Sequence, residues 1–296
     1  MQVKKHAYLI IAHSEFEILK RLLKILDDKA ADMYIHIDKK TKNFDKDVII
    51  SDISSSNVYF IKRRNIEWGG DSQIKCELDL LEAASERKYE YYHLLSGVDM
   101  PLKTPAEINR FFSEEPDKIY LHFTENDPNI QGAIEQRIRY YDLFQQKIGR
   151  GAGSRAAVYE QLNTYILKIQ KLLKIDRMKS YDGVFYKGSN WFSIPHNFAM
   201  YVLSQRKMIK KYFYHSSCAD EIFMQTLAMN SDFKSKVIRS DIHYSDWVRG
   251  TPYVFKNEDY DEVINLDAVF ARKFCAETDP VIIERLYNAL KAKKES

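Results

Sequence analysis

The stretch that decides the fold is residues 6–38, which read HAYLIIAHSEFEILKRLLKILDDKAADMYIHID. Two apolar runs, 6–13 and 33–38, are typical of buried strands, and the segment between them, 14–28, has apolar residues at helical spacing. Ser14 and Glu17 predict a capping box at the start of this helix. A strand, a helix and a strand in this order indicate a parallel, doubly wound α/β sheet.

The next residues continue the same alternation. They predict strands at 57–61 and 89–96 and a helix at 69–87. The four strands run into polar segments: AHS (12–14), HIDKK (36–40), IKRR (61–64) and SGVDMP (96–101). In parallel sheets, ligands bind at the carboxyl ends of the strands. Ordinary loops would explain the polarity but not the recurrence of His, Asp and Arg, so we expect a site at this edge.

Outward from this core the pattern is less regular. An apolar run predicts a strand at 119–123. Residues 186–195 predict a Gly-Ser turn and then a short aromatic strand, followed by a helix at 196–213. A second helix is expected in SSCADEIFMQTL (216–227), with Ser216 or Ser217 as its N-cap. Residues 270–274, FARKF, are interpreted as a loop leading into a short helix. No internal repeat or low-complexity linker divides the chain, which favours one continuous domain over residues 1–296.

Residues 149–175 combine a glycine-rich stretch, GRGAG (149–153), with a basic amphipathic helix. A phosphate-binding glycine motif directly follows a strand, and GRGAG does not. We therefore predict that GRGAG is a surface loop. The helix is expected to pack on the domain through its apolar side. Contact with a membrane surface or a glycolipid is the alternative.

Composition limits the kind of partner and the compartment. The chain has 296 residues with 45 basic and 42 acidic side chains, a balance that gives no reason to expect a nucleic-acid partner. Cys76, Cys218 and Cys275 show no CxxC spacing and are odd in number, which argues against a disulfide framework and favours the cytoplasm. We find neither a signal-peptide pattern nor a run of about 20 apolar residues that could span a membrane.

Six segments in register resemble one known family. They are AYLIIAH (7–13), IHIDKK (35–40), LLSGVDMPLKT (94–104), KGSNWF (187–192), ADEIFMQTL (219–227) and FARKF (270–274). Together they resemble the core-2/I-branching β-1,6-N-acetylglucosaminyltransferase family, which includes peptide O-xylosyltransferases. The resemblance covers roughly residues 7–275 except the region 125–180. The chain is identified as a bacterial member of this family.

The resemblance implies a GT-A-like fold and inverting sugar transfer from a UDP-sugar without a metal or other cofactor. By the same resemblance, residues 1–105 form the nucleotide-binding half and residues 106–296 the acceptor and catalytic half. Two Asp-x-Asp triplets, DKD (45–47) and DYD (259–261), lie in a charged run and at an expected helix start. Both are interpreted as solvated acids or helix caps, so no metal ligands are expected.

Without a metal, cations must stabilise the departing diphosphate, and Arg and Lys can do so. The resemblance assigns diphosphate binding to Lys273, with Arg272 beside it, and to Arg249. Surface cations are the alternative, but Phe270 and Phe274 on either side anchor this segment in a core.

Asp220 and Glu221 raise a question of their own, because acids in a first helical turn are often explained by the helix dipole alone. The resemblance makes Glu221 the general base that deprotonates the acceptor hydroxyl. Asp220 is then expected to cap or position the helix or to contact the sugar. Ala219 departs from the proline that many family members have at this position.

The resemblance also assigns residues to the nucleotide and to the donor sugar. Ile11, His13, Asp38 and Trp68 are expected near the nucleoside, and Asp99 and Trp191 near the sugar. A core role is an equal alternative for each tryptophan.

The sequence therefore predicts an inverting, metal-independent glycosyltransferase. We expect transfer of GlcNAc from UDP-GlcNAc, forming a β-linkage to a glycan or lipid-linked glycan in bacterial surface polysaccharide synthesis, with xylose, glucose or galactose as other donor sugars. The enzyme would act in the cytoplasm, with peripheral association at the inner membrane face as a further expectation. A non-catalytic nucleotide- or glycan-binding protein and a metal-dependent transferase are the alternatives.

Overall fold

The protein is described by a computed structural model over residues 5–124, 129–148 and 155–295. Its largest feature is a seven-stranded sheet in the order β3-β2-β1-β4-β7-β6-β8. The strands β1 (His6–Ala12), β2 (Ala31–Ile37), β3 (Asn57–Phe60) and β4 (Tyr91–Ser96) are parallel. These four strands lie where the sequence predicts them and form the half of the sheet that is doubly wound.

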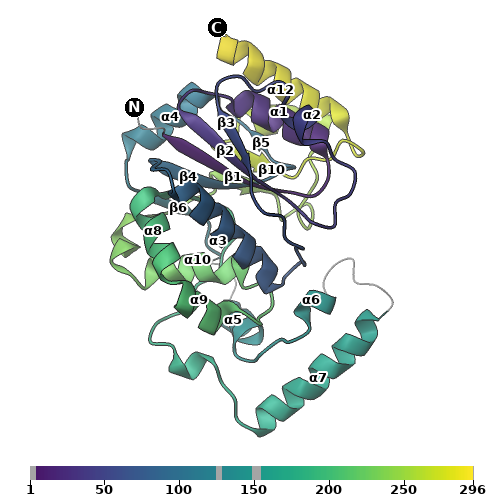
Figure 1. The fold of residues 1–296 in the computed structure, drawn as a ribbon, viewed down its shortest axis with the longest axis vertical. Helices are drawn as coiled ribbons and strands as arrows, with labels where there is room; N and C mark the ends of the chain where they lie inside the picture. Colours follow the sequence, from purple (N-terminus) through teal and green to yellow (C-terminus); the bar gives the residue numbers. More distant parts are fainter. Residues whose placement is uncertain (1–4, 125–128, 149–154, 296) are drawn as a thin grey trace.

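Helices cover both faces of the sheet because successive residues of a strand point to opposite sides. On β1, Ala7 and Leu9 belong to the core beneath α3 (Asp71–Ser85), whereas Tyr8 and Ile10 pack with α1 (Phe16–Leu26). Figure 1 shows α1, α2 (Lys46–Ile50) and α12 (Pro280–Glu295) on one face, and α3, α8 (His196–Ser204) and α10 (Asp220–Met229) on the other.

The second half of the chain extends the same sheet. β7 (Phe192–Pro195) is antiparallel to both of its neighbours, β4 and β6 (Ile119–Leu121), and β8 (Val237–Arg239) is parallel to β6. The sheet thus continues from residues 1–105 into residues 106–296. The predicted class is confirmed: the fold is α/β, with a mostly parallel sheet between helices.

A second, three-stranded sheet lies beside the first. It has the order β5-β10-β9, formed by β5 (Met100–Pro101), β10 (Phe270–Arg272) and β9 (His243–Ser245). Phe270 packs in the same core as Tyr8 of β1, so the small sheet is joined to the large one through apolar side chains. The prediction of a loop and helix at 270–274 is wrong, because residues 270–272 pair with two distant strands.

The remaining helices and short turns complete the chain. They are α4 (Pro105–Glu114), α5 (Ile130–Ile138), α6 (Gln145–Ile148), α7 (Ala156–Leu172), α9 (Arg206–Phe213) and α11 (Tyr260–Ile264), with 3-10 turns at Met178–Ser180, Asp232–Lys236 and Asn257–Asp259. The helix predicted at 196–213 is two helices, α8 and α9, which meet at Gln205. The short strand predicted at the end of 186–195 is confirmed at 192–195, after the segment that contains Gly188 and Ser189.

Two predicted helix caps are wrong. α1 begins after Glu15, whose φ is 56°, and has no side-chain cap, so Ser14 and Glu17 do not form a capping box. α10 begins after Ala219, also without a side-chain cap. Ser216 instead accepts a hydrogen bond from Nη1 of Arg177 at 2.8 Å. Both helices are held by packing and not by the local capping motif.

α7 stands apart from the body of the molecule (Figure 1), and Gln170 is its only buried residue. The expectation that this helix packs its apolar side on the domain is wrong. The GRGAG prediction (149–153) lies outside the described part of the chain. Among the helices of the described residues, none is both long and apolar enough to cross a bilayer.

Candidate active site

The carboxyl ends of β1, β2 and β4 meet at one edge of the large sheet. The backbone N–H of Asp38 donates to the carbonyl of Ala12 at 2.9 Å, and that of Gly97 donates to the carbonyl of Ile11 at 2.9 Å. A side chain on Gly97 would lie 2.7 Å from Cβ of Ala12, so the chain can pass here only as glycine. The structure therefore brings the predicted segments around residues 11–13, 38 and 96–99 together.

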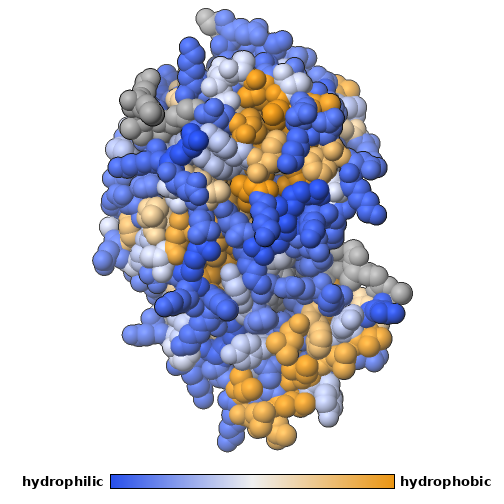
Figure 2. All heavy atoms as spheres, viewed as in Figure 1, coloured by the Kyte–Doolittle hydropathy of each residue, from blue (hydrophilic) through white to orange (hydrophobic). Residues whose placement is uncertain are grey.

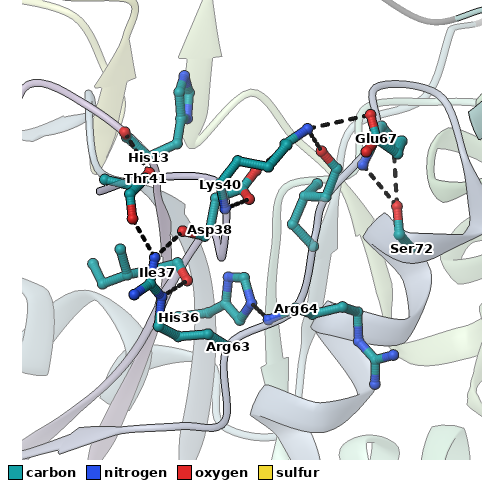
Figure 3. A network of polar contacts seen from close by, with 11 residues as sticks. His13, His36, Ile37, Asp38, Lys40, Thr41, Arg63, Arg64, Glu67 and Ser72 are labelled. Carbon is teal, nitrogen blue, oxygen red and sulfur yellow. Dashed lines mark hydrogen bonds and ion pairs between the residues drawn. The ribbon is translucent and has the colours of Figure 1, made fainter. Parts of the chain in front are cut away.

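Asp38 is the centre of a polar network at the end of β2 (Figure 3). It is buried, and its Oδ1 accepts a hydrogen bond from the backbone N–H of Lys40 at 2.8 Å. The ammonium of Lys40 lies 3.8 Å from Oδ2 of Asp38, donates to the carbonyl of Ile66 at 2.6 Å and pairs with Glu67 at 3.2 Å. Lys40 thus joins the end of β2 to the loop that precedes α3.

Trp68 lies in that loop and is 45% exposed, so it is not the core tryptophan that the alternative interpretation required. The following Gly69 has a φ of +70°, a conformation that favours glycine. Its carbonyl accepts a hydrogen bond from the backbone N–H of Cys218 at 2.7 Å. The loop that carries Trp68 therefore contacts the turn just before α10.

Arg272, Asp99 and Trp191 form a compact group at the end of β10. Nε of Arg272 lies 3.6 Å from Oδ1 of Asp99, and its guanidinium carbon lies 4.2 Å from the centre of the Trp191 ring. The other oxygen of Asp99 accepts from the backbone N–H of Ser96 at 2.7 Å. Burial raises the pKa of Asp99 to about 6, although the nearby Arg272 acts in the opposite direction.

Lys273 follows directly, and its position is fixed by backbone bonds on both sides. Its carbonyl accepts from the N–H of Phe255 at 3.0 Å, and the N–H of Phe274 donates to the carbonyl of Val98 at 3.2 Å. Lys273 makes no ion pair within the ranges that the structure describes, unlike Arg272 and Lys40.

The pKa of His13 is affected by several charged side chains at this edge. Burial lowers the pKa of His13; the charge of Asp38 opposes this, and the charges of Lys273, Lys40 and Arg272 lower the pKa further. The imidazole therefore lies within electrostatic reach of three cations and one carboxylate that come from separate parts of the chain. This edge of the sheet suits an anionic ligand.

Arg249 is the predicted cation that the structure does not offer to such a ligand. Its guanidinium is ion-paired with Asp246, with Asp259 at 2.8 Å and with Glu262 at 2.8 Å. Asp246 and Asp259 are buried, so Arg249 neutralises carboxylates inside its own loop. Arg272 and Lys273 remain as the predicted diphosphate-binding side chains at the edge.

Glu221 lies in the first turn of α10 with its carboxylate partly exposed. Nη1 of Arg137 donates to its Oε2 at 2.5 Å, and Nζ of Lys187 lies 3.8 Å from the same oxygen. Neither partner of Glu221 is among the residues predicted from the sequence. Arg137 falls in the region without family resemblance, whereas Lys187 begins the KGSNWF segment and could have been found there.

Asp220 has the opposite environment. It is buried, and burial together with the neighbouring Glu221 charge raises the pKa of Asp220 to about 7. Glu77 of α3 is fully buried, and burial and the Asp220 charge hold the pKa of Glu77 well above its ordinary value. Asp220 therefore faces the interior, and the structure gives no support to its predicted contact with a sugar.

Residues 187–191 connect the two parts of the site. Lys187 pairs with Glu221, the N–H of Gly188 donates to the carbonyl of Glu221 at 2.9 Å, and Trp191 stacks under Arg272. Four residue steps span at most ~14 Å, so the partners of Glu221 and of Arg272 are close neighbours. The structure thus places the predicted base and the cationic edge on either end of one short loop.

A cavity of about 380 Å³ opens next to this loop. Lys187 lines the cavity and also pairs with Glu221. The other walls are formed by Phe123, Thr124, Ile130, Gln131, Ile134, Phe185, Tyr186 and Arg239. Aromatic walls with a few polar groups are typical of binding sites for small ligands and sugars.

The two Asp-x-Asp triplets have structural roles. Asp45 caps α2 by accepting from the N–H of Asp47 at 2.9 Å, and Asp259 accepts from the N–H of Lys256 at 2.8 Å. Among the described residues, no three His, Cys, Asp or Glu side chains are grouped as a metal site. Asp45 and Asp259 therefore accept backbone hydrogen bonds at the starts of helices.

Comparisons with known proteins give one family model and several relatives that are similar to this chain. The model of the Core-2/I-branching enzyme family matches residues 6–263. Xylosyltransferase 2 of Canis lupus familiaris is 24% identical over 95% of this chain and 33% of that protein. The human N-acetyllactosaminide beta-1,6-N-acetylglucosaminyl-transferase is 24% identical over 95% of this chain and 70% of that protein. The chain spans about a third of the length of the xylosyltransferase 2 relatives that it matches.

Among solved structures, mouse xyloside xylosyltransferase 1 in its apo form has a TM-score of 0.42 with 10% sequence identity, covering 93% of this chain and 99% of that one.

Proposed function

Because the chain belongs to the Core-2/I-branching enzyme family, we propose that it is an inverting glycosyltransferase that needs no metal ion. It would transfer a sugar, GlcNAc in the first instance, from a UDP-sugar to a hydroxyl of a glycan acceptor and form a β-linkage. One observation carries this proposal: the loop 187–191 joins the carboxylate of Glu221 to the guanidinium of Arg272, which is next to Lys273.

The cationic edge would bind the donor. When the sugar leaves UDP, negative charge grows on the diphosphate, and fixed cations can stabilise it where other enzymes use a divalent ion. Lys273 is available for this task because no described carboxylate pairs with it, and Arg272 lies next to it. The nucleoside would lie toward Ile11, His13 and Asp38, with Trp68 at its border.

Glu221 would act as the general base. A positioned carboxylate that removes the proton from an attacking hydroxyl contributes about 10²–10⁴-fold to such a step. Arg137 and Lys187 fix the position of this carboxylate while leaving it partly exposed. Attack from the side opposite UDP inverts the anomeric carbon, so an α-linked donor gives a β-linked product.

The cavity beside Lys187 would receive the acceptor. Its aromatic residues Phe123, Phe185 and Tyr186 suit the apolar faces of sugar rings. We propose a lipid-linked or other membrane-proximal glycan of bacterial surface polysaccharide synthesis as the acceptor. All three cysteines are free, which supports action in the reducing cytoplasm. A membrane-proximal acceptor would then place the enzyme at the inner face of the membrane.

Release of UDP from UDP-GlcNAc, UDP-xylose, UDP-glucose and UDP-galactose, with and without EDTA, tests the proposal. Wild-type protein should turn over one donor equally in both conditions. Glu221→Gln should lower the rate about 10²–10⁴-fold while UDP binding, measured by calorimetry, is retained. Glu114→Gln, at an exposed position of α4, is the matched control and should behave as wild type.

Each alternative predicts a different outcome. Activity that disappears in EDTA and returns with Mg²⁺ would identify a metal-dependent transferase. UDP binding without turnover of any donor or acceptor would identify a binding protein. Full activity of Glu221→Gln would remove Glu221 from the role of base.

A further inference from the structure

The helix α7 presents its apolar residues to solvent. Leu172 is 81% exposed and Tyr165 is 65% exposed. The exposed apolar stripe, as we call this set, is Val158, Leu162, Tyr165, Ile169, Leu172 and Leu173. Steps of three and four residues put all of these side chains on one face of a helix. Figure 2 shows the corresponding hydrophobic surface over α7, low in the view.

The protein holds α7 by a different face. The side-chain amide of Gln170 exchanges two hydrogen bonds with the backbone of Tyr141, at 2.8 and 2.9 Å. The ring of Tyr159 packs against that of Phe144, with 5.5 Å between the centres. An ordinary surface helix turns its apolar side to the core. α7 does the reverse, so its stripe is suited to contact with something outside the folded domain.

Charge indicates what that contact is. Between residues 155 and 174 there are four basic side chains, Arg155, Lys168, Lys171 and Lys174, against one acid, Glu160. Lys168 lies one turn before Leu172 and therefore borders the stripe. A second copy of this face would bring the same positive charge, whereas anionic lipid headgroups bring the opposite charge. A helix with an apolar face and basic residues beside it is typical of helices that lie in a membrane interface.

We propose that α7 docks the protein on an anionic membrane surface. The exposed apolar stripe would enter the boundary between headgroups and acyl chains, and Lys168 beside it would contact anionic headgroups. Arg155, Lys171 and Lys174 would add to the electrostatic attraction of the anionic surface. The biological purpose of this docking rests on the proposed function, because docking through α7 would bring the cavity beside Lys187 to a membrane-bound acceptor. Vesicle binding itself requires no substrate and can be measured alone.

Co-sedimentation with vesicles tests the proposal. Wild-type protein should bind vesicles of phosphatidylcholine with 30% phosphatidylglycerol, bind pure phosphatidylcholine much more weakly, and dissociate as salt is raised. The double variant Leu162→Ser/Leu172→Ser should bind the anionic vesicles at least about tenfold more weakly. Val48→Ser/Val281→Ser changes two exposed apolar helix residues elsewhere and should bind as wild type. Equal thermal melting of all three proteins would show that they are folded.

Other outcomes would overturn the proposal. Absence of wild-type binding to anionic vesicles would do so. So would a wild-type dimer in solution that becomes monomeric in Leu162→Ser/Leu172→Ser, because a second copy would then cover the stripe. UDP release with a soluble acceptor separates the two proposals. Wild-type protein that transfers the sugar but does not bind anionic vesicles contradicts the membrane site alone, whereas wild-type protein that binds vesicles but does not transfer contradicts the transferase alone.

Discussion

Asp220 and Glu221 are consecutive acids with opposite surroundings. Successive residues of a helix point about 100° apart, so one side chain can enter the core while the next faces a site. Asp220 lies in the interior, where burial raises its pKa to about 7, and Glu221 is partly exposed between Arg137 and Lys187. Their different surroundings therefore follow from the direction of each side chain and not from its chemical type.

In the proposed function, Lys273 is the residue on which donor binding without a metal would depend most directly. Lys273→Met should weaken UDP binding about 10–100-fold, because it removes a charge-assisted contact to phosphate, and should leave uridine binding unchanged. Calorimetry with UDP and with uridine measures both. Lys291→Met, at an exposed position of α12, is the matched control. Equal weakening of UDP and uridine would show that Lys273 supports the fold of the site instead of binding phosphate.

At the scale of elements, the loop 187–191 depends on one close backbone approach. A side chain on Gly188 would overlap the carbonyl oxygen of His122 and would lie 2.7 Å from the side-chain nitrogen of Gln225. Gln225 itself holds the loop by donating to the carbonyl of Ser189 at 2.6 Å. The loop can therefore approach β6 and α10 only with glycine at this position.

Gly188→Ala should lower the free energy of unfolding by about 1–3 kcal/mol, the usual cost of overpacking, and should lower transfer activity because Lys187 and Trp191 move. Urea unfolding and UDP release measure the two effects. Gly132→Ala is the matched control, since nothing lies near that position in α5, and it should stabilise the protein by about 0.5–1 kcal/mol. A Gly188→Ala variant as stable and active as wild type would contradict the role given to the loop.

Most elements with strong periodicity could be predicted from the sequence, whereas those decided by distant contacts could not. The strands of the first 100 residues and α3 lie within a few residues of their predicted ends. Residues 270–272 are too few to show a period, and they become a strand by pairing with 100–101 and 243–245. The break at Gln205 between α8 and α9 has neither Gly nor Pro to signal it.

The same distinction applies to the site. Family resemblance indicated Glu221, Arg272 and Asp99, which the structure places at the two ends of one loop. The resemblance does not reach Arg137, so the partner that holds Glu221 could be found only in three dimensions. Arg249 forms ion pairs with three carboxylates that the fold brings close to it, and these pairs could not be predicted from the sequence.

At the scale of the whole molecule, a buried chain of hydrogen bonds runs from the large sheet to the small one. His6 of β1 bonds His93 of β4 at 2.8 Å, His93 bonds Ser193 of β7 at 2.7 Å, and Ser193 bonds His243 of β9 at 3.0 Å. Burial lowers the pKa of His6 to about 4 and that of His243 to about 3. All of these rings are therefore neutral in the folded protein at physiological pH.

Protonation on unfolding should make the stability of the whole molecule sensitive to acid. The pKa values of His6, His36 and His243 are about 4, 4 and 3 in the folded protein, against an ordinary value of 6.5. Between pH 6.5 and 4 the unfolded chain takes up protons that the folded protein excludes. The free energy of unfolding therefore decreases as the pH is lowered, by about 1.4 kcal/mol per pH unit for each net proton taken up.

Two buried carboxyls act in the opposite direction. The pKa of Asp99 is raised to about 6 and that of Asp220 to about 7 from 3.8, so these groups lose protons on unfolding and their contribution to stability falls as pH rises through the same window. Urea unfolding from pH 4.5 to 8 should show maximum stability near neutral pH. Asp220→Asn removes one of the two carboxyls that release a proton on unfolding. The free energy of unfolding of this variant should therefore decrease more steeply as the pH is lowered below 6, and at pH 8 it should exceed that of wild type. Identical profiles for the two proteins would show that Asp220 is ionised in the fold.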